Sequence, residues 1–459
     1  MKKLDDYASL IGEAGVEEIR QEAEDLEGKS FAHVNATFYG GGVAEMLNSY
    51  VPLLNDAGVN TEWRLIKGSK EFFTITKQIH NSLQGGKESL SKEEIDLFEK
   101  AVEENSRFMD LKWYDSVVID DPQPAPLINH YPRTSPAFWK PLPVLLELET
   151  YQKKQPWILR MHIDLTASNP KTFKYFKSLA EKYDALVVSK QEYAKNIRKP
   201  IFVIPPAIDP FSDKNRELKS YESSRILEKH DIDARTPIVL QVSRFDIWKD
   251  PLGVIEAFKL VREKVKCQLI LIGSHAADDP ESEEVFNQAY KAAEKNKDVT
   301  LITLQNDLLV NALQREAAVV IQKSLREGFG LTVSEALWKN TPVVASNVGG
   351  IPLQIEDGKN GFLVNNVREC ALKTEYLLKN PQIARQMGEH GRAKVMREFL
   401  ITRLVKDEIE LLKEMSRTTH TIKPPRALQQ VIHAFKKTPD FLKKGLHLFR
   451  LSPSKRNIK

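Results

Sequence analysis

The sequence predicts an α/β protein built from two doubly wound domains in tandem. Short apolar runs alternate with stretches of helical period, and this rhythm occurs twice along the 459 residues. Alternating strands and helices form a parallel sheet that is covered by helices on both faces. A polar stretch, residues 207–235, interrupts the rhythm and indicates a linker between the two series.

The first series follows a stretch of helical period at residues 4–27 and defines an N-terminal domain, residues 1–210. Residues 397–415 are expected to pack back on this domain. Apolar runs rich in β-branched and aromatic residues predict its strands. These runs are 30–34, 61–66, 116–120, 157–163, 185–189 and 201–205.

The second series defines a C-terminal domain, residues 211–396, and the chain ends in a separate tail, residues 416–459. Between the strands lie helical stretches, for example residues 252–265. The expected strands are 237–243, 267–273, 299–304, 318–322, 342–346 and 361–365. Ligands of such sheets bind beyond the carboxyl ends of the strands, so the site is expected between the two domains.

Charge is distributed unevenly along the chain. The formal net charge is +4, but the segment from Arg417 to Lys459 carries eleven Lys or Arg residues and one acid, Asp440. The rest of the chain is therefore acidic, which argues against a nucleic-acid-binding protein. Apolar residues recur at helical spacing within 428–449, so the basic tail is either solvated or in contact with an anionic membrane or a partner.

The composition indicates a cytoplasmic protein. The two cysteines, Cys267 and Cys370, fit a reducing compartment, and Cys267 lies in an apolar run. The first residues lack the apolar core of a signal peptide. No apolar run approaches the ~18 residues of a membrane span.

The stretch from Ser324 to Gly350 holds two glutamates, Glu327 and Glu335, on either side of a glycine turn. A strand leads into the turn and a helix leaves it, so backbone N–H groups at the helix start could bind an anion. Both carboxylates suit sugar hydroxyls. The alternative is an ordinary turn and surface helix. The backbone groups concerned belong to Gly328, Phe329, Gly330 and Leu331.

Two further segments could bind phosphate. Arg244 and Lys249 follow a predicted strand, where two fixed cations suit a diphosphate and would stabilise charge on a departing phosphate. Without other evidence, such a basic pair is as often simply part of the solvent-exposed surface. Gly40 to Gly42 separate the first strand from a helix, so backbone can approach a ligand there. The segment is not GxGxxG, which argues against a nicotinamide cofactor, and a tight turn is the alternative.

Polar residues at two other strand ends are candidates for sugar contacts. His162 and Asp164 alternate onto one face after a strand, and Asp121 and Gln123 follow another. A lone histidine at a strand end is more often structural. The chain lacks GxxxxGK[ST], HExxH, CxxC, GxSxG and an acid pair of the DxD kind, so the chemistry is expected to need no bound metal.

Together these motifs resemble the retaining GT-B glycosyltransferases of family 4. EGFGLTVSEA resembles the family's paired-glutamate element, and SRFDIWKD its phosphate clamp. NVGGIPLQIEDGKNGFLV is similar to a further family run, with Gln354 where glutamate is usual. Within the family, FAHVNATFYGGGVAEML, DDPQPAP, RMHIDL and residues 58–86 resemble the TreT-type trehalose synthases, which are related to the trehalose phosphorylases. The resemblance covers residues 1–415.

The resemblance implies the GT-B fold, two Rossmann-like domains facing across a cleft, with the acceptor on the N-terminal domain and the nucleotide sugar on the C-terminal one. The resemblance also implies a role for each candidate residue. Arg244 and Lys249 would hold the donor diphosphate, Glu327 would bind the donor glucose, and Glu335 would bind the ribose. Gly41 and Gly42 would approach the reacting centre, and His162 would contact the donor sugar. The acceptor is assigned to Asp121, Gln123 and Asp164.

The implied reaction is reversible transfer of glucose, with retention, from a nucleoside diphosphate glucose to glucose, giving α,α-trehalose. No cofactor is required, apart from Mg²⁺ that can accompany the nucleotide sugar, and relatives suggest a homodimer. Three alternatives stay open: a trehalose phosphorylase that uses phosphate, a membrane-surface glycosyltransferase acting on a lipid or polysaccharide, and a silent sugar-nucleotide sensor.

Overall fold

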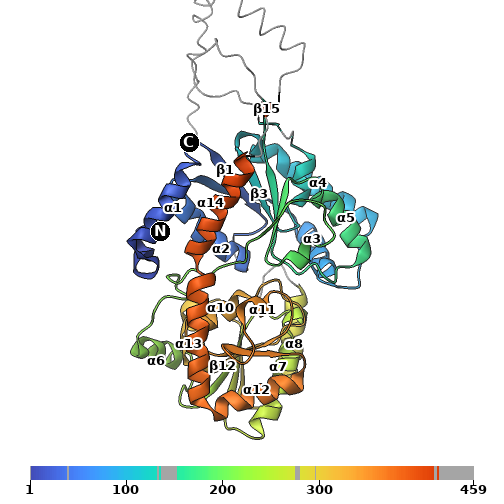
Figure 1. Ribbon diagram of the computed structural model, residues 1–459. Coiled ribbons are helices and arrows are strands. Elements are labelled where there is room, and N and C mark those ends of the chain that lie inside the picture. The colour runs from blue at the N-terminus through green and yellow to red at the C-terminus, as the bar shows by residue number, and fades with distance from the viewer. Residues whose placement is uncertain are drawn as a thin grey trace, which may run out of the picture.

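The computed structural model describes residues 2–38, 41–131, 134–135, 152–273, 280–294, 296–417 and 421–422. Within them the chain forms two α/β domains, one above the other in Figure 1. Each domain contains a six-stranded parallel sheet. The predicted fold class, two doubly wound domains, is confirmed.

The first sheet has the strand order β2-β1-β3-β6-β7-β8. All twelve strands of the two sheets coincide with predicted runs to within a few residues, because each run is apolar and bounded by polar or glycine-rich segments. The strands of the first sheet are β1 (Ser30–Asn35), β2 (Asn60–Leu65), β3 (Ser116–Asp120), β6 (Trp157–Met161), β7 (Ala185–Val188) and β8 (Ile201–Val203).

The second sheet has the order β11-β10-β9-β12-β13-β14. Numbered from one along the domain, this is the order 3-2-1-4-5-6 of dinucleotide-binding folds. Its strands are β9 (Ile238–Val242), β10 (Gln268–Ile272), β11 (Val299–Ile302), β12 (Ala317–Gln322), β13 (Val343–Ser346) and β14 (Gly361–Val364).

Helices cover both faces of each sheet (Figure 1). In the first domain they are α1 (Ala8–Glu24), α2 (Gly42–Asp56), α3 (Lys70–Leu83), α4 (Lys92–Met109) and α5 (Pro170–Ala180). Those that follow are α6 (Ser220–Glu228), α7 (Pro251–Arg262), α8 (Pro280–Ala293), α9 (Asp307–Glu316), α10 (Leu331–Trp338), α11 (Ile351–Gln354), α12 (Val367–Lys379), α13 (Pro381–Glu398) and α14 (Ile401–Arg417).

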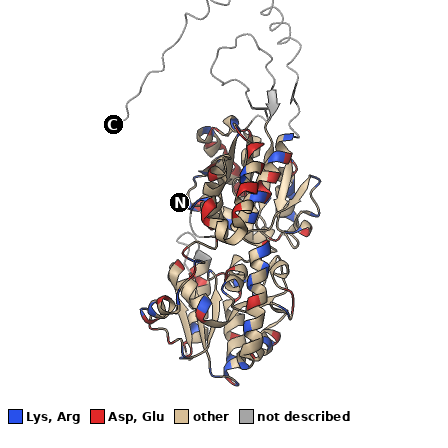
Figure 2. Ribbon diagram, turned by 60° about the vertical axis from the view of Figure 1, so that its left-hand side comes forward, with Lys and Arg blue, Asp and Glu red and all other residues tan. Residues whose placement is uncertain are grey.

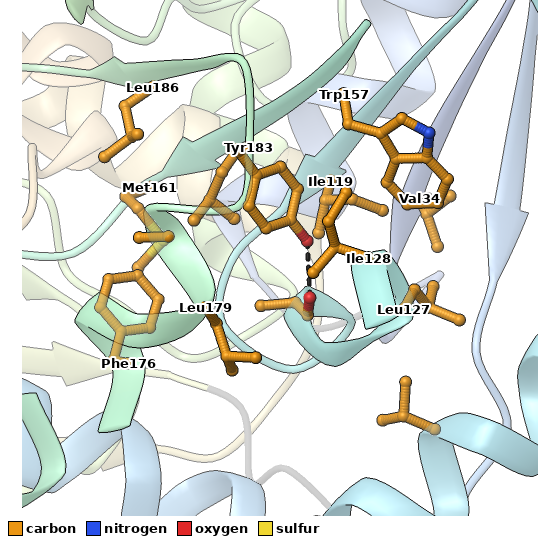
Figure 3. Close-up of a cluster of buried hydrophobic side chains, with 14 of the residues drawn as sticks. Val34, Ile119, Leu127, Ile128, Trp157, Met161, Phe176, Leu179, Tyr183 and Leu186 are labelled. Carbon is orange, nitrogen blue, oxygen red and sulfur yellow. Dashed lines mark hydrogen bonds between the residues drawn. The ribbon is translucent and has the colours of Figure 1, made fainter. Parts of the chain in front are cut away.

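Each face of the first sheet carries its own hydrophobic core, because successive strand residues point to opposite faces. Val117 and Ile119 belong to the core under α3, α4 and α5, whereas Val118 belongs to the core under α1, α2 and α14. Figure 3 shows part of the first core, where the Tyr183 hydroxyl donates to the Ala125 carbonyl at 2.6 Å.

The last helix among the described residues returns from the second domain to the first. Helix α13 packs on α10, and α14, red in Figure 1, then packs on α1 and α2. Leu404, Val405 and Ile409 of α14 are buried there. Helix α14 continues through Arg417, into the first residues of the predicted basic tail. Residues 418–420 and 423–459 of that tail lie outside the described residues.

Two features differ from the sequence-based expectations. The polar stretch 207–235 contains helix α6, whose Ser223 and Leu227 are buried and which packs against α9. A small antiparallel sheet joins β4 (Thr134–Ser135), β5 (Gln152–Lys154) and β15 (Thr421–Ile422). Strands of two or three residues are too short to show a period in the sequence.

Charged residues of both signs are interspersed over the two domains in the view of Figure 2. Within the described part of the chain, no helix is both long and apolar enough to cross a bilayer.

Candidate active site

Several of the predicted site residues follow strands at the two points where the order of the sheets reverses. In the second sheet this point lies between β9 and β12, and the loops that leave these strands carry Arg244 and Glu327. In the first sheet it lies between β1 and β3, and the loops carry Gly41 and Asp121. Ligands of open α/β sheets bind at such points.

These loops meet at the interface between the domains. A Cβ atom on Gly328 would approach the carbonyl oxygen of His162 to well inside 3.0 Å, and one on Gly42 would lie 2.8 Å from Leu331 Cδ1. The Tyr193 hydroxyl, from the first domain, donates to the carbonyl of Gly328 at 2.8 Å. The structure thus brings predicted residues of both domains together.

Glu327 is 7% exposed and anchors a hydrogen-bond cluster. Its Oε2 accepts from Lys249 Nζ at 2.6 Å, from Ser324 Oγ at 3.0 Å and from Gln322 Nε2 at 3.2 Å. Hydrogen bonds to a charged group are shorter and stronger than neutral ones, so this carboxylate is firmly placed. Lys249 and Glu327, predicted to bind separate parts of the donor, therefore form one ion pair.

A second ion-pair cluster surrounds Asp246, which the sequence analysis missed. Asp246 Oδ2 accepts from Lys77 Nζ at 3.1 Å and lies 3.6 Å from a guanidinium nitrogen of Arg244. Burial alone would raise the pKa of Asp246, but the charges of Lys77 and Arg244 outweigh it and hold this pKa at about 2. The carboxylate is ionised and places Arg244.

Helix α3 of the first domain supplies more of this cluster. Lys77, His80 and Asn81 share one face of α3, at the spacing i, i+3, i+4. The Asn81 side chain accepts from Trp248 Nε1 at 3.1 Å, beside Lys249. Burial and the positive charges of Lys77 and Arg244 lower the pKa of His80 to about 3, so its imidazole is neutral. The sequence does hold a signal for these residues, because the run TITKQIHN is polar on one helical face.

The charges of this region favour an anion. Three cations, Lys77, Arg244 and Lys249, stand against two carboxylates, Asp246 and Glu327. The balance is positive at the carboxyl edge of the second sheet. Fixed cations arranged this way suit a diphosphate and stabilise charge that develops on its oxygen.

The glycine turn before α10 has the predicted geometry. Gly330 lies in the left-handed region with φ of 84° and directs the chain into α10, which begins at Leu331. Gln354 supports the turn: its amide donates to the Phe329 carbonyl at 2.6 Å, and its Oε1 accepts from Ser334 at 2.6 Å. Gln354, which stands where the family usually has glutamate, therefore supports the glycine turn through both ends of its amide.

Glu335 lies one turn into α10 and is 3% exposed. Its Oε2 accepts from Gln314 at 3.3 Å, and its Oε1 lies 3.9 Å from Lys214 Nζ. Lys214 also pairs with Glu45 of α2 at 2.7 Å. Glu335 is therefore part of a bridge between the two domains, a role that its spacing from Glu327 did not predict.

His162 is fixed by the two acids that end β3. Its backbone N–H donates to Asp121 Oδ1 at 2.9 Å, and its Nε2 lies 3.3 Å from Asp120 Oδ1. Asp121 has a positive φ of 70°, which suits a short polar turn residue. Burial raises the pKa of Asp121. Its Oδ1 thus supports the loop that carries His162.

The two other residues assigned to the acceptor differ in how they are held. Asp164 Oδ1 accepts from the backbone N–H and the hydroxyl of Thr166, at 2.9 and 2.6 Å, which closes a local turn. Its Oδ2 lies 3.9 Å from Arg326 of the second domain. Gln123 Oε1, in contrast, is buried without a hydrogen-bond partner among the described residues.

Two other features of the described residues bear on ligands. No group of three or more His, Cys, Asp or Glu side chains in them is placed to hold a metal ion. A cavity of about 580 Å³ opens between β8 and α14. None of the residues lining this cavity belongs to the clusters around Glu327 and Asp246, so burial and charge, rather than volume, identify the site.

Replacement of Lys77 by Met keeps the apolar stem and removes one of the three cations. We expect turnover to fall about tenfold or more, because each 1.36 kcal/mol of lost transition-state stabilisation is tenfold in rate. Lys70→Met, at the exposed start of the same helix, is the matched control. Steady-state rates that are equal for the two variants would show that Lys77 has no part in the reaction.

The fold and the site define a glycosyltransferase of the GT-B class. Residues 33–141 and 140–195 match the family described as "Trehalose synthase, N-terminal domain", and residues 222–394 match "Glycosyl transferases group 1". The chain is 42% identical over 424 residues to the trehalose synthase of Pyrococcus horikoshii. This match covers 90% of the chain and 97% of the relative. It belongs to the trehalose synthase family.

Other relatives agree with this assignment. The trehalose synthase of Rubrobacter xylanophilus is 40% identical over 422 residues, covering 90% of this chain and 97% of the relative. A trehalose phosphorylase of Pleurotus pulmonarius is 26% identical, and the match covers 86% of this chain and 58% of that protein. A trehalose-phosphate synthase structure from Burkholderia vietnamiensis has a TM-score of 0.64 at 12% identity, covering 85% and 99%, and supports the fold.

Proposed function

We propose that the protein transfers glucose from a nucleoside diphosphate glucose to free glucose, reversibly and with retention, giving α,α-trehalose. One observation carries the proposal. A chain 42% identical to a trehalose synthase over nearly its full length presents three cations, Lys77 from its first domain and Arg244 and Lys249 from its second, at the carboxyl edge of the second sheet. Such a set suits the diphosphate of a sugar nucleotide.

In the proposed reaction the bond between the sugar C1 and the β-phosphate oxygen breaks as the acceptor hydroxyl oxygen bonds to C1 on the same face. The departing phosphate oxygen takes the hydroxyl proton, so no side chain acts as base. Arg244, with Lys77 and Lys249, would stabilise the charge on that oxygen. The domains would hold donor and acceptor at reacting distance and exclude water.

Glu327 has a double role in this proposal. Its Oε2 accepts hydrogen bonds from Lys249, Ser324 and Gln322, and so positions Lys249 for the diphosphate. We assign its Oε1 to hydroxyls of the donor glucose. The N–H groups at the start of α10 would face the same donor, because a helix N-terminus favours anions.

The other predicted contacts keep their assignments as proposals. Gly41 and Gly42 would approach the reacting centre, and His162 would contact the donor sugar. Glu335 would reach the ribose after exchange of its contact with Lys214. Gln123, with its unpartnered amide oxygen, is the strongest of the acceptor contacts, ahead of Asp121 and Asp164. We propose no resident cofactor; Mg²⁺ would arrive with the nucleotide sugar.

Phosphorolysis is the second candidate, because phosphate could occupy the same cations and the trehalose phosphorylases are relatives. One experiment separates the candidates in the synthetic direction. Glucose is incubated with ADP-, UDP- or GDP-glucose, or with glucose 1-phosphate, and the disaccharide is identified by NMR. We expect α,α-trehalose from a nucleotide sugar. Trehalose formed only from glucose 1-phosphate would overturn the proposal, as would a product of another linkage.

A further inference from the structure

Behind His162 lies a buried polar cluster that the proposed reaction does not use. It joins β1, α2, β3, β6 and α14, so it connects the carboxyl end of β3 to the C-terminal helix. All five of its side chains are at most 2% exposed. They are His33, Tyr50, Asp120, Arg160 and Glu408.

The contacts form a continuous path from α14 to His162. Glu408 pairs with Arg160, and its Oε1 lies 3.4 Å from His33 Nε2. His33 Nδ1 lies 2.9 Å from Asp120 Oδ2. The other oxygen of Asp120 lies 3.3 Å from His162 Nε2. Tyr50 contacts His33 at 2.9 Å and Arg160 at 3.3 Å from a third side.

Charge balance determines the state of this cluster. A buried carboxylate persists only when it is paired, and here two carboxylates, Asp120 and Glu408, require two cations. Arg160 is one, and a protonated His33 is the other. Burial alone would lower the pKa of His33, but the two carboxylates outweigh it and raise this pKa. In turn Arg160 and His33 lower the pKa of Glu408 against the effect of burial.

An ionised Asp120 fixes the tautomer of His162. A carboxylate only accepts hydrogen bonds, so His162 Nε2 is the nitrogen that carries the proton in this contact, and in the neutral imidazole Nδ1 is then the nitrogen with the lone pair. The backbone of His162 is held as well, by Asp121 at its N–H and by Gly328 packed against its carbonyl. Ring and backbone are thus both fixed before a sugar arrives.

We propose that Asp120 is a positioning residue for His162, and that Glu408 of α14 acts through His33 to keep Asp120 ionised and in place. The C-terminal helix therefore belongs to the active site, although it does not touch the substrates. The kinetic part of this inference rests on the proposed glucosyl transfer, whereas the tautomer of His162 does not.

The test compares Asp120→Asn with the parent enzyme by ¹⁵N spectra of histidine-labelled protein, with His162→Gln assigning the signal. An asparagine side chain can donate as well as accept, so it permits both tautomers. We expect a single Nε2–H tautomer for His162 in the parent enzyme and a mixture in Asp120→Asn. An unchanged His162 signal in the variant would overturn the proposal, whatever reaction the enzyme performs.

Kinetics then ask whether Asp120 acts through His162. We expect Asp120→Asn to lower kcat on the order of 10- to 100-fold, by analogy with the loss when the orienting partner of a metal-bound histidine is removed, with little change in KM. Added to His162→Gln, the same change should cost no further activity. Losses that multiply would contradict the proposal.

Tyr183→Phe controls for destabilisation. It leaves the buried Ala125 carbonyl without its donor, in the core drawn in Figure 3, and it touches no member of the cluster. We expect a lower Tm with unchanged kcat per folded enzyme. Glu408→Gln should reproduce the tautomer mixture of Asp120→Asn more weakly. A Glu408→Gln spectrum like the parent's would remove α14 from the proposal.

The protonated His33 also predicts a dependence of stability on pH. Because its pKa is raised in the folded protein, the cluster of Asp120, Glu408, Arg160, Tyr50 and His162 stabilises the fold fully below the unfolded value of about 6.5. This contribution is lost as the pH rises through the folded pKa.

Thermal unfolding from pH 6 to 9 checks this. The parent protein should lose more stability over that range than His33→Gln, while His390→Gln, at an exposed histidine, should keep the parent's slope. Equal slopes for the parent and His33→Gln would show that His33 is not the titrating group.

Discussion

Arg244→Ala is expected to lower turnover on the order of 10²- to 10³-fold, about 3–4 kcal/mol, the effect of removing one donor to a developing oxyanion. Arg244 follows β9 at the reversal point of the second sheet and is placed by the buried carboxylate of Asp246. Alanine leaves Asp246 paired with Lys77, so the fold should persist. The loss should therefore fall on kcat rather than on Tm.

Turnover at saturating donor and acceptor measures this effect. Arg235→Ala is the control, because that side chain is 91% exposed and pairs only locally, with Asp233. A near-normal rate for Arg244→Ala would remove Arg244 from the diphosphate site and with it the proposed stabilisation of the leaving group.

Gly328→Ala is expected to have an effect of similar size for a steric reason. The new Cβ would fall well inside 3.0 Å of the His162 carbonyl oxygen, which is backbone and cannot rotate away. The glycine turn would have to separate from the β6 loop, and with it the donor from the acceptor. Because a misplacement of 1 Å can reduce a rate about 100-fold, we expect at least that loss.

Rates and Tm measured together test this prediction. Overpacking also destabilises, typically by about 1–3 kcal/mol, so Tm should fall with the rate. Gly15→Ala is the control: within helix α1 its new Cβ would meet only the Ile11 side chain, nearest at Ile11 Cβ at 3.2 Å, so a small local shift accommodates it. Normal turnover by Gly328→Ala would show that the close approach of Gly328 to His162 is not needed.

The strands were predictable because each is a continuous apolar run, as buried parallel strands are. The positions of Arg244, Glu327 and His162 were predictable for the same reason: each follows such a run, so the sheet alone places it beyond the carboxyl end of a strand. Helix α6 was missed because only two of its residues, Ser223 and Leu227, are buried.

Other site residues could not be found from local patterns. Lys77 reaches Asp246 from a helix of the other domain, and Glu408 reaches His33 across 374 intervening positions. Nothing in a local pattern specifies such contacts. Conversely, three acids that were assigned to sugars, Asp121, Asp164 and Glu335, all hold protein groups in the structure.

Several expectations stay predictions. The domain boundaries, the cytoplasmic location and the homodimer are among them, and so is the contact of the basic tail with an anionic membrane, since most of that tail lies outside the described residues.

The identity of the activated sugar decides whether this site works on a nucleoside diphosphate. Purified protein is incubated with trehalose and ADP, UDP, GDP or inorganic phosphate, and the activated glucose formed is identified. We predict a nucleoside diphosphate glucose, which would also name the base. Glucose 1-phosphate, formed only with phosphate, would contradict the account and make the protein a phosphorylase; no activated glucose from any mixture would contradict the assignment of trehalose itself.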